Sequence, residues 1–175
     1  WGALAWPLNT MGTLGFSANV LRVAPFASYD NSNQRTGNVS AQDLALTFGY
    51  AHNVQWPTPL SLGGNIKYLN SRLAGYRSQA AAVDLGALWE LYPDKKMENR
   101  LKVGAAVRNF GQKMSFIDEA FPLLMSFAIG SSIQGPLLHA YRGNYIFQLD
   151  TVVPNDRSPY IGLGAEVGVL DMFAI

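Results

Sequence analysis

The chain has 175 residues and no cysteine, and its 13 basic and 12 acidic side chains leave a formal net charge of +1. This balance provides no electrostatic footprint for nucleic acid, and the lack of cysteine excludes disulfides and thiolate metal sites. Charged residues make up 14% of the chain, well below the roughly 25% of an average soluble domain.

The first residues do not resemble a targeting signal, because 1–10 contain no basic stretch followed by an apolar one. Two long uncharged stretches, at 1–21 and 121–141, are both interrupted by Pro and Gly. A transmembrane helix needs about 20 mainly apolar residues without such breaks. We therefore expect no signal peptide and no membrane-spanning helix.

Side chains alternate instead with a period of two residues. In the segment 41–54, even positions such as Leu46 and Phe48 are bulky and mostly apolar, whereas odd positions such as Thr47 are small or polar. This pattern predicts a strand whose two faces meet different surroundings. The expected strands, in chain order, are 11–23, 41–54, 60–71, 79–92, 99–110, 123–129, 145–150 and 161–169.

The connections between these strands carry turn residues. Short proline-containing turns are expected at 56–59, 93–96 and 154–157, and a longer polar loop at 30–37. No segment with helical periodicity intervenes, so parallel strands joined by helices are not expected. The sequence predicts one all-β domain over 1–175 with antiparallel, up-and-down connections.

The composition of the two faces indicates their surroundings. The polar faces are mainly Gly, Ala, Ser, Asn and Thr with one or two charges per strand, too few for the exterior of a soluble sheet. A transmembrane barrel places apolar residues toward lipid and small or polar residues toward the lumen. We therefore predict a transmembrane β-barrel that contacts the lipid bilayer, with a soluble β-protein as the alternative.

Aromatic residues fall into two groups near opposite ends of the strands, as expected for the two membrane interfaces. The predicted interfacial set at one end is Tyr50, Trp56, Trp89, Tyr92, Tyr141 and Tyr145. The set at the other end is Phe26, Tyr29, Tyr68, Tyr76, Phe110, Phe116, Phe121 and Tyr160.

The polar faces carry charges of both signs. The predicted lumen-facing residues are Asp43, Lys67, Asp84, Glu90, Arg100, Lys102, Arg108, Asp150 and Glu166. They could line a polar passage or a docking surface. The alternative, which we favour, is a set of cross-strand ion pairs that fills the interior of the barrel.

Several segments resemble the PorV/PorQ group of outer-membrane barrels, which is related to the FadL-like transporters. The matching segments are LGGNIKY at 62–68, AVDLGALW at 82–89, LKVGAAVRNFG at 101–111, FPL at 121–123 and GLGAE at 162–166. The resemblance extends over roughly 40–175 and implies a location in the bacterial outer membrane.

Full members of that group form barrels of about fourteen strands, within the range known for such proteins, and begin with a signal peptide and an Asn-Pro-Ala motif. Neither feature occurs in this sequence. The resemblance therefore implies that the chain is the central part of a barrel and lacks N- and C-terminal strands. A closed eight-stranded barrel is the alternative.

The resemblance also implies a function: a partner-binding component of protein secretion of the type IX kind or of surface assembly, with other outer-membrane or secreted proteins as partners. The alternatives are a FadL-like transporter of hydrophobic compounds and a structural outer-membrane barrel. Short turns at 56–59 and 93–96 are expected to face the periplasm, and the loops at 30–37 and 111–120 the exterior.

No residue pattern indicates an enzyme. His52 and His139 lack the spacing of a zinc site, and no G-x-S-x-G motif is present. Asp84 and Glu90 share a face of one strand, but about 20 Å of strand rise separates them, too far for a glycosidase pair. We predict no catalytic, metal or cofactor site.

Overall fold

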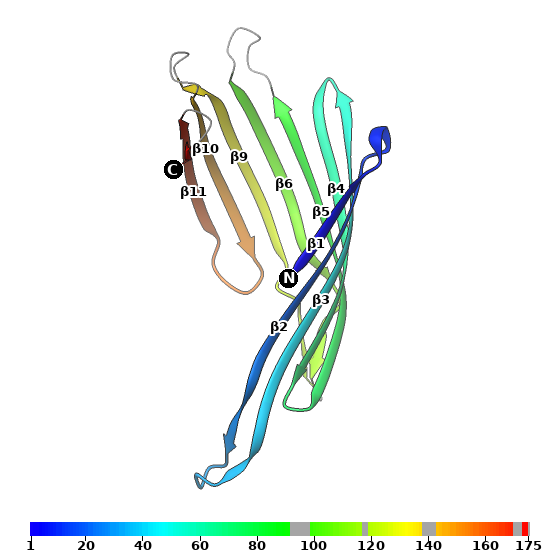
Figure 1. Cartoon of the computed structure of the whole chain (residues 1–175), viewed down its shortest axis with the longest axis vertical. Helices are drawn as coiled ribbons and strands as arrows, with labels where there is room; N and C mark the ends of the chain where they lie inside the picture. The colour runs from blue at the N-terminus through cyan, green and yellow to red at the C-terminus, as the bar shows by residue number, and fades with distance from the viewer. Residues whose placement is uncertain (92–98, 117–118, 138–142, 170–172, 175) are drawn as a thin grey trace. The chain divides into compact units, whose positions relative to one another are not determined.

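The computed structural model describes residues 1–91, 99–116, 119–137, 143–169 and 173–174, most of which lie in β-strands (Figure 1). The strands are β1 Gly2–Pro7, β2 Thr13–Tyr29, β3 Arg35–Trp56, β4 Thr58–Leu73, β5 Tyr76–Leu91, β6 Arg100–Gly111, β7 Met114–Phe116, β8 Glu119–Phe121, β9 Ser126–Leu137, β10 Gly143–Pro154, β11 Tyr160–Val169 and β12 Phe173–Ala174. A single 3₁₀ turn, Asn9–Met11, joins β1 to β2. None of the described helical segments is long and apolar enough to cross a membrane.

The strands form a ten-stranded sheet in the order β1-β2-β3-β4-β5-β6-β9-β10-β11-β12, and β7 pairs with β8 in a separate hairpin. Neighbours in the sheet are also neighbours in the sequence apart from the inserted hairpin, and they run antiparallel. The prediction of an all-β, antiparallel, up-and-down fold is therefore confirmed. Within the described residues the sheet is open, with β1 and β12 at its two edges.

The expected strand count of eight was wrong for this sheet, which has ten strands. The eight expected strands correspond to β2, β3, β4, β5, β6, β9, β10 and β11. The two additional ones are β1, whose sequence GALAWP has too little contrast between its faces to be recognised, and the two-residue β12. The β7–β8 hairpin lies in the segment 111–121, most of which was expected to be a loop.

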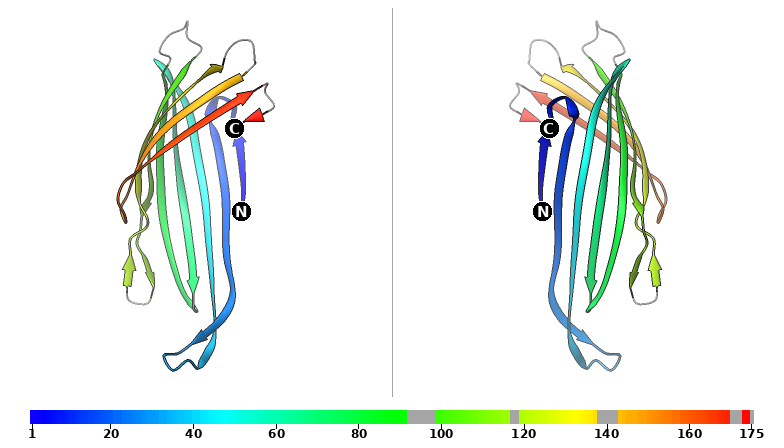
Figure 2. Two further views of the ribbon diagram at one scale, coloured as in Figure 1. Left: turned by 90° about the vertical axis from the view of Figure 1, so that its left-hand side faces the viewer. Right: turned by 90° about the vertical axis from the view of Figure 1, so that its right-hand side faces the viewer.

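The hairpin of β2 and β3 is longer than expected, because β2 has 17 residues and β3 has 22 (Figure 2). Its connection is 30–34, shorter than the polar loop expected at 30–37. Asp30 closes it by accepting hydrogen bonds at Oδ1 from the backbone N–H groups of Ser32 and Gln34, at 2.9 and 2.8 Å. This local capping by an aspartate is typical of tight turns.

A two-residue turn connects β4 to β5. Ala74 and Gly75 both have positive φ, 50° and 86°. Such a turn matches the right-handed twist of the strands that it joins. It places Leu73 opposite Tyr76 and thereby sets which residues of β4 and β5 face each other.

The chain divides into two compact units, each with its own part of the sheet. The first consists of Trp1–Tyr50, Gly64–Asp84 and Asn109–Leu123, and the second of Ala51–Gly63, Leu85–Arg108 and Leu124–Ile175. In the second unit, β10 pairs with both β9 and β11, and the register places Phe147 opposite Ile133 and Leu149 opposite Leu163. Apolar side chains of neighbouring strands therefore share one face.

The described residues bury very little apolar surface. The buried apolar side chains are Ala80 and Ala82. They alternate along β5 with exposed residues, on the same face as the buried Ser78. Large apolar side chains on the opposite face are exposed in both units, including Phe48 and Ile66 in the first and Leu163, at 84%, in the second. The sheet thus exposes its large apolar residues and covers its small ones.

Candidate functional site

Strand β5 shows how the two faces of the sheet differ. Ser78, Ala80 and Ala82 are at most 3% exposed, whereas Val83 and Leu85, which point to the other side, are exposed. We call the face of the small residues the inner face and the opposite face the outer face. Asp84 follows the buried residues on the inner face, and it is there that polar side chains of three strands converge.

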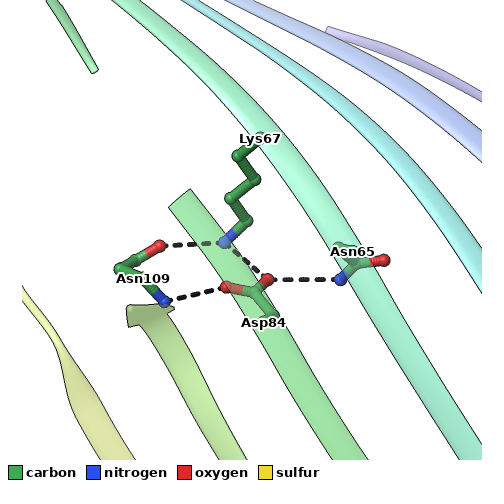
Figure 3. Close-up of polar contacts among 4 residues, drawn as sticks. All are labelled: Asn65, Lys67, Asp84 and Asn109. Carbon is green, nitrogen blue, oxygen red and sulfur yellow. Dashed lines mark hydrogen bonds and ion pairs between the residues drawn. The ribbon is translucent and has the colours of Figure 1, made fainter. Parts of the chain in front are cut away.

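The Asp84 cluster consists of Asn65 and Lys67 of β4, Asp84 of β5 and Asn109 of β6 (Figure 3). Lys67 Nζ lies 2.6 Å from Asp84 Oδ2, and Asn65 Nδ2 donates to the same oxygen at 3.2 Å. Lys67 Nζ also donates to Asn109 Oδ1 at 2.9 Å. The side chains of Asp84 and Lys67 are 13% and 20% exposed, so water screens the pair only in part.

The fourth contact of the cluster involves the backbone of β6. The N–H of Asn109 donates to Asp84 Oδ1 at 2.8 Å, and Asn109 has a left-handed backbone with φ of 56°. Asn tolerates this conformation better than most residues. Three residues further on, the backbone contacts β5 again, because Gln112 N–H donates to the carbonyl of Ala81 at 2.9 Å. Asp84 therefore holds a local irregularity of β6 in place.

Glycines on neighbouring strands make room for inner-face polar side chains. A Cβ at Gly49 would lie 2.3 Å from Asn65 Oδ1, so Asn65 can lie across β3 only because residue 49 has no side chain. The second unit repeats this arrangement on β9, β10 and β11. The pairs there are Asp150 with Gly130, Gln148 with Gly164 and Asn144 with Gly168.

The remaining predicted lumen-facing residues are distributed over both units. Glu90 and Lys102 form an ion pair at 3.3 Å in the second unit, and Asp43 accepts a hydrogen bond from Ser71 at 2.5 Å in the first. Asp150 lies across Gly130, as described above. Arg100, Arg108 and Glu166, all in the second unit, are exposed. The nine residues are thus not one site.

Three of the predicted interfacial aromatic residues make polar contacts through their rings or hydroxyls. Trp89 Nε1 donates to Thr58 Oγ1 at 2.7 Å, and the hydroxyl of Tyr145 donates to Asn99 Oδ1 at 3.0 Å. Tyr50 donates to the carbonyl of Met11 at 2.5 Å. Tyr92 and Tyr141 lie outside the described residues, as does the side chain of Trp56.

The outer face of the second unit contains a shallow depression over β6, β9, β10 and β11. Apolar side chains dominate its lining, chiefly Leu101, Ile133, Phe147, Leu149 and Leu163. These residues belong to the same face as the exposed apolar side chains. The depression is therefore a feature of the apolar outer face and not of the polar inner face.

The chemistry of the Asp84 cluster is structural. Asp84 accepts from three different donors, which leaves its carboxylate poorly suited to take a proton from a substrate. Among the residues that the structure describes, no three His, Asp or Glu side chains converge as metal ligands would. The sequence indicated Lys67 and Asp84 but missed Asn65 and Asn109. The sequence Asn109-Phe110-Gly111, at the end of an alternating segment, is a signal from which a bulge in β6 could have been predicted.

The comparisons with known proteins give no family. No protein-family model matches the chain, and no curated protein is significantly similar to it. The resemblance to PorV/PorQ barrels therefore rests on the short segments quoted above.

Proposed function

We propose that the chain is part of an outer-membrane β-barrel that spans the bilayer with its outer face toward lipid. The observation that carries this proposal is the burial pattern. Phe16, Phe48, Ile66 and Val83, on four neighbouring strands, are between 37% and 64% exposed, whereas the residues buried in the same unit are small ones such as Ser78, Ala80 and Ala82. A water-soluble sheet would bury the large side chains instead.

The energetics favour a lipid environment for this face. Each fully buried large apolar side chain contributes roughly 1.5–3 kcal/mol relative to the same side chain in water. The exposed residues of the outer face forgo most of that contribution in water and regain it in hydrocarbon. On the inner face, by contrast, charges of opposite sign pair within the protein in Lys67–Asp84 and Glu90–Lys102. Both faces then have a suitable environment, as in transmembrane barrels.

Membrane partitioning tests this proposal. The full chain, expressed with a route to the outer membrane, should sediment with outer membranes and stay in solution only with detergent. If further strands close the sheet, unheated samples should migrate differently from heated ones on a detergent gel. A monodisperse monomer in detergent-free buffer, with the same β-sheet content, would contradict the proposal.

Within the membrane, we propose a partner-binding role in protein secretion or surface assembly. The support is the resemblance of 62–68, 82–89, 101–111 and 162–166 to PorV/PorQ barrels. Gentle extraction of the tagged chain followed by identification of co-purifying proteins tests it, with an unrelated barrel carrying the same tag as the control. Recovery of the same proteins with both baits would exclude a specific partner.

A transporter of hydrophobic compounds receives less support. Such a protein needs an apolar path on its inner face, where the alternation of the described strands places scattered large apolar residues, among them Leu21 and Val23 of β2, Leu88 of β5, and Ile146 and Val152 of β10. The apolar depression over β6, β9, β10 and β11 is on the outer face.

A further inference from the structure

A row of arginines crosses the outer face of the first unit. The hydroxyl of Thr36 on β3 donates to the hydroxyl of Ser28 on β2, which aligns these two strands. The hydroxyl of Ser71 on β4 donates to the carboxylate of Asp43, which aligns β4 with β3. Counting along the antiparallel strands from these contacts and from the Ala74–Gly75 turn aligns one residue from each of four strands. The aligned residues are Arg22 of β2, Gln42 of β3, Arg72 of β4 and Arg77 of β5. We call Arg22, Arg72 and Arg77 the arginine row.

The arginine row lies where the apolar part of the outer face ends. The same counting aligns Phe16, Phe48, Ile66 and Val83 across these strands, all exposed. From Ile66 to Arg72 the strand rises by about 20 Å, which is about 15 Å along the membrane normal at the usual tilt of about 40°. Half of a hydrocarbon core is also about 15 Å. With Ile66 near mid-bilayer, the arginine row reaches the phosphates of one leaflet.

Neighbouring polar residues fix the position of Arg77. Its Nε donates to Asn70 Oδ1 at 3.1 Å. With the Gln79 amide in the orientation that satisfies its neighbours, the amide oxygen of Gln79 accepts from Arg77 Nε at 2.8 Å and from Nη2 at 2.5 Å. The same oxygen accepts from the hydroxyl of Tyr68 at 3.0 Å. Tyr68 thus contributes its hydroxyl to the polar network that holds Arg77.

The three guanidinium groups form no ion pair within the described part of the chain. Among the residues that the structure describes, no carboxylate lies within ion-pair distance of Arg22, Arg72 or Arg77. All three side chains are exposed. Three aligned cations without counter-ions repel one another, and an external anion would relieve that repulsion.

We propose that the arginine row binds the phosphate groups of anionic lipid headgroups. The guanidinium plane matches phosphate oxygens in bidentate geometry, and the apolar rows beside it would contact the acyl chains of the same lipid. A free phosphate ion would use only the arginines, and an acidic protein segment would leave the adjoining apolar rows uncovered. This inference rests on the proposal that the outer face contacts lipid.

Lipid retention tests the proposal. The full chain is inserted into vesicles of phosphatidylcholine alone or mixed with phosphatidylglycerol, and the lipids retained after gentle extraction are counted by native mass spectrometry. The wild type should retain phosphatidylglycerol in preference to phosphatidylcholine. Each substitution among Arg22→Gln, Arg72→Gln and Arg77→Gln should weaken phosphatidylglycerol retention about fivefold, since one basic residue near an anionic surface contributes about that factor.

The control variant Arg35→Gln/Lys113→Gln/Arg157→Gln removes the same charge from exposed positions outside the row and should retain phosphatidylglycerol like the wild type. If the combined Arg22/Arg72/Arg77 variant fails to insert, the single variants supply the comparison. Equal phosphatidylglycerol retention by the wild type and the row variants overturns the proposal. An equal loss of phosphatidylglycerol in the control variant also overturns it, because net charge alone would then explain retention. Displacement of the lipid by inorganic phosphate would indicate a free-phosphate site. Failure of the wild type to insert into either vesicle would overturn the membrane proposal itself.

Discussion

The ion pair of the Asp84 cluster should contribute more to stability than the ion pair of Glu90 with Lys102. A double-mutant cycle with Lys67→Met and Asp84→Asn measures the first pair, and a matched cycle with Lys102→Met and Glu90→Gln measures the second. Asp84→Asn keeps an oxygen for the Asn109 N–H, so the cycle isolates the charge interaction. Each cycle compares the free energies of unfolding of the wild type, both single variants and the double variant.

The expected magnitudes follow from distance and exposure. Lys67 and Asp84 are 2.6 Å apart and 20% and 13% exposed, whereas Lys102 and Glu90 are 3.3 Å apart and 25% and 22% exposed. Exposed ion pairs contribute about 0.2–1 kcal/mol, and a partly desolvated pair with further hydrogen bonds contributes more. We expect a coupling energy of about 1–2 kcal/mol for Lys67–Asp84 and about 0.5 kcal/mol for Glu90–Lys102.

Reversible urea unfolding in one lipid or detergent, followed by tryptophan fluorescence, gives these energies. High salt should reduce the coupling of Glu90–Lys102 more than that of Lys67–Asp84, because exposed charges are screened more strongly. A coupling energy for Lys67–Asp84 no larger than that for Glu90–Lys102 would refute the reasoning. It would mean that the convergence of Asn65, Lys67 and Asn109 on Asp84 adds nothing beyond what the Glu90–Lys102 pair contributes.

Three further measurements test the faces, the packing and the orientation. Phe48→Arg should destabilise the protein in lipid by about 2–4 kcal/mol if residue 48 lies near mid-bilayer. Thr47→Arg, on the inner face, should lower the free energy of unfolding clearly less in the same urea titration. The reverse order would mean that the inner and outer faces are exchanged. Gly111→Ala should lower the free energy of unfolding by about 1–3 kcal/mol, because the added Cβ would lie 2.2 Å from the carbonyl oxygen of Ala81. In the control Gly162→Ala the added Cβ meets nothing within 4 Å, so this variant should be nearly neutral. Equal losses of stability in the two variants would contradict the backbone contact at Gly111. A cysteine introduced at position 33, in the β2–β3 loop, should react with a membrane-impermeant reagent in intact cells and one at position 57 should not, and labelling of 57 alone would reverse the orientation.

Much of the fold could be predicted because the alternation of side chains was clear where one face is apolar. Leu46, Phe48 and Ile66 fall on the outer face because every second residue does, and the turn residues separated the segments. The ends of the long hairpin were less predictable. Beyond Val20 the large apolar residues Leu21 and Val23 move to the other face of β2, so the alternation reverses and the outer segments of β2 and β3 did not look like continuations of one strand.

The polar cluster could be predicted only in part. Lys67 and Asp84 carry opposite charges on adjacent strands, which made an ion pair plausible from the sequence. Their other partners depend on alignment: Asn65 faces Asp84 because of the two-residue turn at Ala74–Gly75, and Asn109 reaches it through a local change in φ. The arginine row was missed for the same reason, since Arg22, Arg72 and Arg77 become neighbours only when three strand alignments are known.

The glycines of β9 and β11 have a consequence for how the sheet selects its alignment during folding. A shift of β11 by two residues against β10 would keep every apolar side chain on the outer face, so the hydrophobic pattern alone does not prevent it. In the observed alignment Gln148 faces Gly164 and Asn144 faces Gly168. A shift by two in one direction would set Gln148 against Glu166, and in the other would set Asn144 against Glu166. The spacing of glycines thus distinguishes alignments that the alternation of polarity treats as equivalent.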